Sequence, residues 1–317
     1  MVAANALMSH PRAEEFALEV DPNQQAVIDR FQRWSATYFL GLFSGRLFDQ
    51  VLLPEVAAGV ESTGRIRYTP FARAGRSAAS DQLVVWGDAE TRQGEFDRLK
   101  TLHRDIRGVS SDGVRFSALS PEAWNWILIS TMFMYLNSYR AIAREDVSDN
   151  DLQTLWEHSL QQFDGLQLTG RNRLPHSYAD AVAYYDSVIA TKGERTAIFA
   201  HVMRHLRRPP APEGAPPVLR PLLRLLGRLP IRVVRILSLG ITEPSVRELG
   251  GYRWTRRDHA EFALYTRVIG IAHRGLPRRL VYTPLAYNRW RYERIVGKYQ
   301  RAGLESFVPD GRCPIGR

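Results

Sequence analysis

The chain has 317 residues, of which 44% are hydrophobic and 24% are charged, so its composition is that of a folded protein and excludes general disorder. Its formal net charge is +10, and residues 201–317 hold 23 Arg and Lys residues against 8 Asp and Glu residues. A basic half can bind nucleic acid, but only 3 of the 43 basic residues are lysine, which favours a compositional bias toward arginine. We therefore expect no nucleic-acid partner.

Cysteine usage and the N-terminal residues bear on the cellular compartment. The single cysteine, Cys313, excludes a disulfide framework and a thiolate zinc site, and it suits a reducing compartment. The first residues lack the charged and apolar regions of a secretory signal. The most apolar run, residues 124–136, is shorter than the roughly 20 residues that span a bilayer. We expect a cytoplasmic protein, either free or peripheral to a membrane.

The predicted elements are helices along most of the chain. Apolar residues recur at steps of three and four, the spacing that places them on one face of a helix, whereas the alternating pattern of strands is scarce. The expected fold class is all-α, a single large multi-helix domain over residues 21–300 with few or no strands, after a flexible segment 1–20 and before an irregular tail 301–317. The predicted helices cover residues 21–51, 95–107, 121–139, 148–163, 177–206, 218–239, 256–273 and 283–300.

Two consecutive segments separate the middle of the chain from its end. Residues 208–217 (RPPAPEGAPP) break the helical pattern and predict a surface loop inside the domain. In residues 218–239, arginines recur every four residues from Arg220 to Arg232, with leucines on the other face. This segment is interpreted either as a core helix with a solvated arginine face or as an interfacial helix on anionic lipid. Pro230 is expected to kink or split it.

His103 is the histidine with the most informative surroundings. It shares a helical stripe with Leu99 and Ile106, where a histidine is most often a core residue with a satisfied hydrogen bond. An axial heme ligand needs the same arrangement, a neutral imidazole on a rigid helix that faces an apolar cavity. The aromatic residues of 124–139 suit the lining of such a cavity and suit plain core equally well. Spacing leaves both interpretations open.

Other chemical motifs are weaker. His201 and His205 share a helix face at i, i+4 spacing, which can chelate a divalent metal. No glutamate of the HExxH type lies between them and no further ligand cluster is evident, so we expect solvated or core-edge histidines. The sequence has no phosphate-binding glycine loop and no G-x-S-x-G nucleophile elbow.

The run that follows His103 adds a second kind of information. The pattern has a set order: a histidine, an isoleucine, two glycines, an aromatic residue, an alanine, Pro-Glu and a tryptophan. The residues are His103, Ile106, Gly108, Gly113, Phe116, Ala118, Pro121, Glu122 and Trp126. This pattern closely resembles the hallmark of the MpaB-type oxygenase family, which includes the latex-clearing proteins (rubber oxygenases). The resemblance implies that His103 is the proximal ligand of a heme iron and that Trp126 lies in the heme pocket.

An upstream segment also resembles that family. The family has an arginine near the heme and a threonine four residues later, and Arg73 and Ser77 stand at those places. In the latex-clearing branch a lysine just before the threonine can occupy the distal side of the heme, and Arg76 stands there. A guanidinium stays protonated and cannot donate a lone pair to iron, so no lysine-type closed state is expected. The resemblance implies Arg73, Arg76 and Ser77 as catalytic residues, with Arg73 and Ser77 also in contact with the heme.

The resemblance extends over about residues 31–294 and implies a function. It predicts a heme b-dependent oxygenase that uses dioxygen on an apolar, alkene or isoprenoid-type substrate. A rival of another class is a cofactor-free helical protein of the same fold that binds an apolar ligand or a lipid surface, because a fold does not determine a function.

Overall fold

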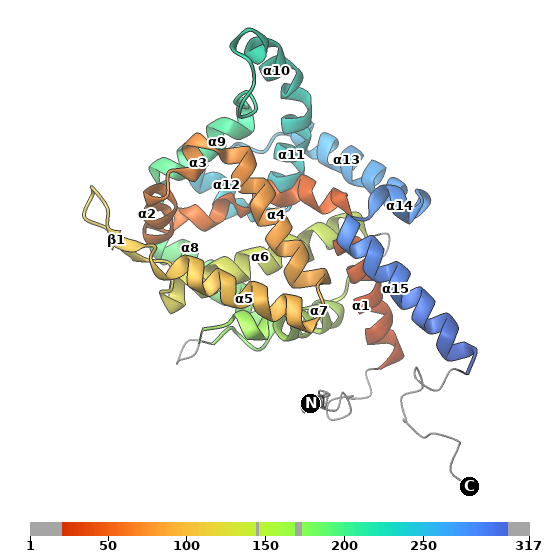
Figure 1. The fold of residues 1–317 in the computed structure, drawn as a ribbon. Helices are drawn as coiled ribbons and strands as arrows, with labels where there is room; N and C mark the ends of the chain where they lie inside the picture. The colour runs from red at the N-terminus through yellow and green to blue at the C-terminus, as the bar shows by residue number, and fades with distance from the viewer. Residues whose placement is uncertain (1–20, 144–145, 169–172, 304–317) are drawn as a thin grey trace, which may run out of the picture.

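The computed structural model describes residues 21–143, 146–168 and 173–303. The predicted flexible segment 1–20 and residues 304–317 of the predicted tail lie outside these described residues. Helices make up most of the described chain, and its strands form one short hairpin (Figure 1). The all-α fold class predicted from the sequence is therefore confirmed.

The elements follow one another through short connections. In chain order they are α1 (Pro22–Ser35), the 3-10 helix η1 (Tyr38–Leu52), α2 (Pro54–Ser62), α3 (Arg65–Tyr68), α4 (Pro70–Trp86), α5 (Ala89–Arg104), β1 (Arg107–Val109), β2 (Arg115–Ser117), α6 (Pro121–Ile142), α7 (Asp149–Phe163), η2 (Asp164–Leu166), α8 (Tyr178–Lys192), α9 (Ala197–Arg207), η3 (Pro217–Leu219), α10 (Arg220–Leu226), α11 (Arg228–Gly240), α12 (Pro244–Leu249), α13 (Arg256–Gly275), α14 (Arg278–Val281) and α15 (Pro284–Arg301).

Long predicted helices are divided where the backbone becomes extended. The predicted helix 21–51 consists of α1 and η1, and Thr37 between them has extended φ and ψ. The predicted helix 177–206 consists of α8 and α9. Helix α8 ends at Gly193, and α9 begins after Thr196, whose side chain caps it. Apolar residues continue at helical spacing across both breaks, so periodicity alone did not reveal them.

The predicted helix 218–239 is divided at Gly227 rather than at Pro230. Pro230 lies in the first turn of α11, where its missing N–H breaks no helical hydrogen bond. The end of α11 is buried through Ile236, Leu237 and Leu239, whereas α10 buries none of its residues. The interpretation as a core helix therefore fits the end of α11, but it does not fit α10.

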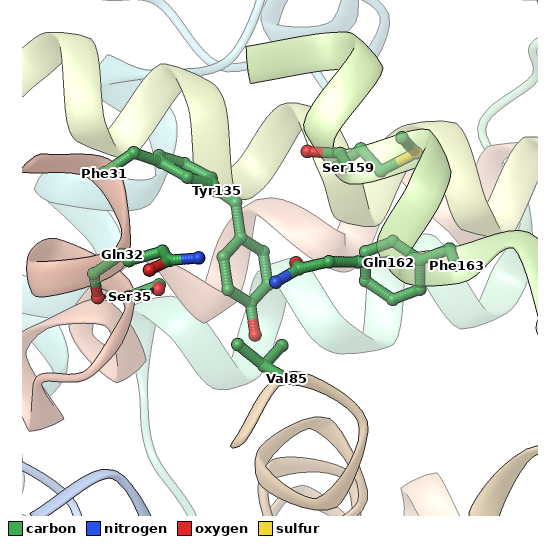
Figure 2. Close-up of a pocket in the computed structure, with 9 residues that line it drawn as sticks. Phe31, Gln32, Ser35, Val85, Tyr135, Ser159, Gln162 and Phe163 are labelled. Atoms are coloured by element: carbon green, nitrogen blue, oxygen red, sulfur yellow. Dashed lines mark hydrogen bonds between the residues drawn. The ribbon is translucent and has the colours of Figure 1, made fainter. Parts of the chain in front are cut away.

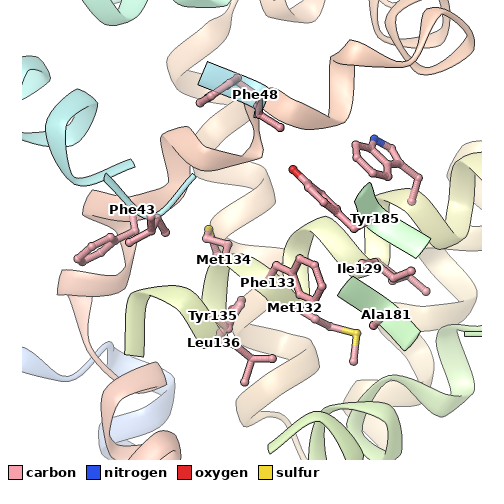
Figure 3. Close-up of a cluster of buried hydrophobic side chains, with 14 of the residues drawn as sticks. Phe43, Phe48, Ile129, Met132, Phe133, Met134, Tyr135, Leu136, Ala181 and Tyr185 are labelled. Carbon is pink, nitrogen blue, oxygen red and sulfur yellow. The ribbon is translucent and has the colours of Figure 1, made fainter. Parts of the chain in front are cut away.

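Helix α6 is the centre of the molecule. It begins at Pro121, as predicted, and it packs against η1, α7, α8 and α13. Figure 3 shows Phe133 and its neighbours on α6 together with Phe43 and Phe48 of η1 and Tyr185 of α8. Although α6 is buried along its length, no helix among the described residues combines the length and hydropathy needed to cross a bilayer.

A buried ionic network joins the helices around α6. The guanidinium of Arg46 donates to the Asp49 carboxylate over 2.6 Å and to Glu243 over 2.8 Å, and the side chains of Arg46 and Asp49 are fully buried. Asp49 also accepts hydrogen bonds from Ser130 at 2.6 Å and from the Tyr185 hydroxyl at 2.7 Å. These bonds connect η1 with α6, α8 and the residue that precedes α12.

Replacement of Arg46 tests how strongly the fold depends on this network. Arg46→Met keeps most of the side-chain volume but leaves two carboxylates without their counter-ion, so we expect a loss of about 3–5 kcal/mol in the free energy of unfolding. Urea denaturation measures it. The control is Arg289→Ala, because the Arg289–Glu293 pair is exposed and its loss should cost less than about 1 kcal/mol. Equal losses in the two variants would contradict the prediction.

Candidate functional site

His103 lies in the last turn of α5 with its imidazole held in one orientation. The side chain is half-buried, and Nδ1 lies 2.7 Å from the carbonyl oxygen of Leu99. Because a carbonyl only accepts hydrogen bonds, Nδ1 carries a proton, and no hydrogen bond to Nε2 is found among the described residues. Backbone carbonyls orient metal-ligating histidines in the same way. The geometry of His103 therefore suits a ligand of a single metal ion.

A tryptophan of α6 packs against this imidazole. The rings of His103 and Trp124 meet edge to face, with centroids 5.4 Å apart, and the Trp124 indole N–H donates to the carbonyl of Leu166 over 2.9 Å. The predicted site residue Trp126 lies elsewhere: it is fully buried, it stacks on Tyr185 at 4.8 Å and its indole N–H faces the carbonyl of Gln50. The structure brings Trp124 to His103 and places Trp126 in the core.

The residues after His103 fold the chain back toward α5. β1 and β2 form an antiparallel hairpin whose turn contains Gly113 at a φ of +80°, which favours glycine. The N–H of Ala118 then donates to the carbonyl of Ile106 over 2.8 Å, and α6 begins at Pro121. The motif between His103 and Trp126 thus forms a compact turn that places the first turn of α6 beside the last turn of α5.

Helices α4 and α5 form an antiparallel hairpin that is held together near the turn between them. Ser80 of α4 donates to the Glu95 carboxylate of α5, and the Arg92 side chain of α5 donates to the carbonyl of Val84 over 2.8 Å. These bonds join the C-terminal half of α4 to the N-terminal half of α5, whereas most of the N-terminal half of α4, where Arg73 lies, is exposed. Among the described residues, no hydrogen bond, ion pair or ring contact joins Arg73, Arg76 or Ser77 to His103.

Arg73 stands out among the predicted residues of α4. It is half-buried, whereas Arg76 and Ser77 are exposed. Burial, together with the nearby cations Arg65 and Arg76, lowers the pKa of the Arg73 guanidinium. Among the described residues no carboxylate forms an ion pair with it. A partly desolvated cation among other cations favours an anionic ligand, and Arg65 belongs to this group although the sequence did not single it out.

The start of α4 is held by the proline-rich loop. The carboxylate of Glu213 accepts hydrogen bonds from the backbone N–H groups of Phe71 at 2.8 Å and Ala72 at 2.9 Å. These are two of the N–H groups that a helix leaves unpaired at its N-terminus, where a negative charge is also favoured by the helix dipole. The contact fixes the loop against the helix that carries Arg73.

A second titratable group lies further along α4. Burial, reinforced by the Glu95 carboxylate, raises the pKa of Asp81 to about 7. Burial raises the pKa of the Tyr135 phenol on α6, and the nearby carboxylate of Asp81 raises it further. Tyr135 also lines a small cavity between α1, α4, α6 and α7 (Figure 2), whose volume of about 10 Å³ is that of a single water molecule. His103 does not line this cavity.

The pair His201 and His205 lies on α9 with ring centroids 4.1 Å apart. Within the part of the chain that the structure describes, no three His, Cys, Asp or Glu side chains gather where they could hold a metal ion. A single imidazole with a free Nε2, as at His103, is sufficient for an axial heme ligand because the porphyrin supplies the other nitrogens.

One family of known proteins matches most of the chain. The family described as "ER-bound oxygenase mpaB/B'/Rubber oxygenase, catalytic domain" matches residues 10–271, a range that contains the α4–α5 hairpin, His103 and α6. The chain thus carries a helical catalytic domain of the oxygenase type. It belongs to the MpaB and rubber oxygenase family, as the motif around His103 implied. No curated protein and no solved structure matches it.

The raised pKa of Asp81 predicts a pH-dependent stability. A carboxyl whose pKa rises from 3.8 unfolded to about 7 folded stabilises the fold when protonated, and this contribution is lost as the pH rises from about 4 to 7. Asp81→Asn removes the loss, so at pH 8 we expect it to stabilise the protein by about 3 kcal/mol relative to its effect at pH 4.5.

Urea denaturation at the two pH values measures this difference. Asp97→Asn serves as the control because Asp97 lies exposed on the neighbouring helix α5. An effect of Asp81→Asn that is the same at both pH values, or a pH dependence equal to that of the control, would contradict the assignment.

Proposed function

We propose that the chain is a heme b-dependent oxygenase that acts with dioxygen on an apolar, alkene or isoprenoid-type substrate. The observation that carries the proposal is the imidazole of His103, whose Nδ1 is anchored to the carbonyl of Leu99 while Nε2 has no partner among the described residues. The edge-to-face contact with Trp124 holds the ring from a second direction. Membership of the oxygenase family supports the reaction class.

The residues around His103, together with Arg73, have donor groups that suit a heme. Nε2 of His103 supplies the one neutral nitrogen that a proximal ligand requires. Arg73 supplies a half-buried cation without a carboxylate partner among the described residues, which suits a heme propionate. Leu99 and Trp124 supply apolar surface beside the imidazole. When bound there, heme iron supplies the activation of dioxygen, which no side chain of the chain can perform.

The chain's own residues would position the cofactor and form hydrogen bonds to its ligands. His103 orients the cofactor through the hydrogen bond of its Nδ1, and Arg73 neutralises a carboxylate at the edge of the cofactor. Ser77 keeps the hydroxyl that the family's threonine provides, so it can donate a hydrogen bond. Arg76 stays protonated, so it cannot close the site as a lysine ligand does. The side chains of Arg76 and Ser77 are exposed, so these roles require that a bound ligand lie against the exposed face of α4.

Removal of the imidazole is the direct test of the cofactor. We expect purified protein, produced with adequate heme, to show a Soret band and about one heme per chain, and His103→Ala to lower heme content at least about tenfold. Absorption spectra and a pyridine hemochrome assay measure both quantities. His176→Ala is the matched control because His176 is exposed and lies outside the motif, so its heme content should not change.

Two outcomes would overturn the proposal. One is wild-type protein without a Soret band, and the other is an unchanged band in His103→Ala. Iron-free protein that still binds an apolar fluorescent probe would instead support the cofactor-free binding protein of the same fold.

The assigned role of Arg73 gives a separate prediction. Loss of a charge-assisted hydrogen bond to a propionate costs about 1.5–3 kcal/mol, so Arg73→Ala should accelerate heme loss roughly 10–100-fold. Transfer of heme to an excess of apomyoglobin measures the rate. Arg104→Ala is the control. Arg104 is an exposed arginine in the last turn of α5, next to His103, and it forms no ion pair with a described residue. Equal rates in the two variants would remove Arg73 from the site.

A further inference from the structure

The hairpin formed by η3, α10 and the start of α11 exposes apolar side chains that the fold does not use. Figure 1 shows α10 at the top of the molecule, standing away from the main body of helices. Val218 is 83% exposed and Leu229 is 68% exposed. We call this set the leucine tip; its exposed members are Val218, Leu219, Leu222, Leu225, Leu226 and Leu229. Transfer of such residues out of water is favourable, so the tip is suited to insertion into an apolar environment.

A cationic cavity lies at the base of the same hairpin. Its volume is about 660 Å³, and α9, the loop after α9 and α10 all contribute to its lining. We call it the arginine pocket; its arginines are Arg195, Arg204, Arg207, Arg208 and Arg224. All of these arginines are exposed, and none forms an ion pair with a described carboxylate. No Asp or Glu is among the described residues that line the pocket.

The pocket and the tip are parts of one surface. Arg224 lies on α10 between Leu222 and Leu225, so the helix that exposes the leucines also contributes to the pocket. The loop residue Pro209 lies close to Gly227, the residue that separates α10 from α11, and also lines the pocket. Apolar side chains at the end of a projection, with cations directly behind them, match the order of layers in a bilayer, where acyl chains lie beneath anionic headgroups.

We propose that the leucine tip and the arginine pocket together form a docking site for an anionic phospholipid membrane. The leucines enter the boundary between headgroups and acyl chains, and the arginine pocket receives lipid phosphates. A nucleic acid would satisfy the arginines but leave the leucines in water. The exposed apolar face of α13, formed by Leu264, Val268 and Ile271, contributes nothing to the arginine pocket and serves as the internal comparison.

Binding to vesicles tests the proposal with the full-length chain. We expect cosedimentation with vesicles of phosphatidylcholine containing about 30% phosphatidylglycerol, and at least about tenfold weaker binding to phosphatidylcholine alone. Binding should weaken when salt rises from 0.1 M to 0.5 M, because the screening length falls well below its value of about 10 Å at 0.1 M.

Two triple variants separate the apolar and the ionic contributions. Each charge near an anionic surface contributes about fivefold in affinity, so Arg204→Gln, Arg207→Gln and Arg208→Gln together should weaken binding by roughly two orders of magnitude. Leu222→Glu, Leu225→Glu and Leu226→Glu should abolish detectable binding, because they replace the inserted side chains with anions. Circular dichroism should show unchanged helix content, since all six side chains are exposed.

Each triple variant has a control that makes the same change elsewhere on the surface. Arg256→Gln, Arg267→Gln and Arg279→Gln remove as many exposed arginines outside the pocket, and Leu264→Glu, Val268→Glu and Ile271→Glu replace as many apolar residues on α13. Both controls should bind the anionic vesicles within about threefold of the wild-type chain, because long-range attraction alone is screened.

Several results would overturn the proposal. These are no binding to anionic vesicles, equal binding to neutral vesicles, or equal losses in the variants and their controls. A wild-type dimer in solution that the leucine substitutions convert to a monomer would assign the tip to a second copy of the chain. Arginine-dependent binding of a short RNA with no vesicle binding would assign the pocket to nucleic acid.

Discussion

The buried guanidinium of Arg46 imposes the strongest constraint on the structure. A cation removed from water is tolerated only where carboxylates and hydrogen-bond acceptors surround it, and its partners come from segments far apart in the sequence. Asp49 lies one turn away on η1, Ser130 and Tyr185 hold that carboxylate from α6 and α8, and Glu243 approaches from the start of α12. The helices can pack closely only in an arrangement that brings these groups together.

The position of the candidate site follows from this constraint. Ser130 fixes the middle of α6 against η1, and Trp124 lies less than two turns before it on the same rigid helix. The indole N–H of Trp124 is bound to the carbonyl of Leu166, and Lys100 of α5 donates to the carbonyl of the adjacent Gly165 over 2.7 Å. The short helix η2 thereby ties α5 to α6, and His103 stands at the place where the two helices meet.

The sequence predicted the features that depend on local residues. α7 begins at a capping box of Ser148 and Asp151, and α6 begins at a proline, so both starts could be read from the chain. His103 was found through the motif that follows it, and the structure explains that motif as the turn between α5 and α6. The division between α1 and η1 was missed because apolar periodicity continues through it.

What the sequence could not supply was the rotation and pairing of distant elements. Trp124 and Trp126 differ by about 200° around α6, so which of them meets His103 depends on the face that α6 turns toward α5. Arg65 and Glu213 were missed for a related reason. The role of Arg65 depends on its proximity to Arg73. The role of Glu213 depends on its contact with the N–H of Phe71 at the start of α4, 142 residues away in the chain.

The contact between Glu213 and α4 makes the proline-rich loop a thermodynamic link between two parts of the molecule. One end of the loop, at Arg208 and Pro209, lines the arginine pocket, and its middle neutralises the N-terminus of the helix that carries Arg73. A ligand that repositioned the loop would therefore change the electrostatic potential at the start of α4. Because linkage is reciprocal in binding free energy, such a coupling would act in both directions by the same factor.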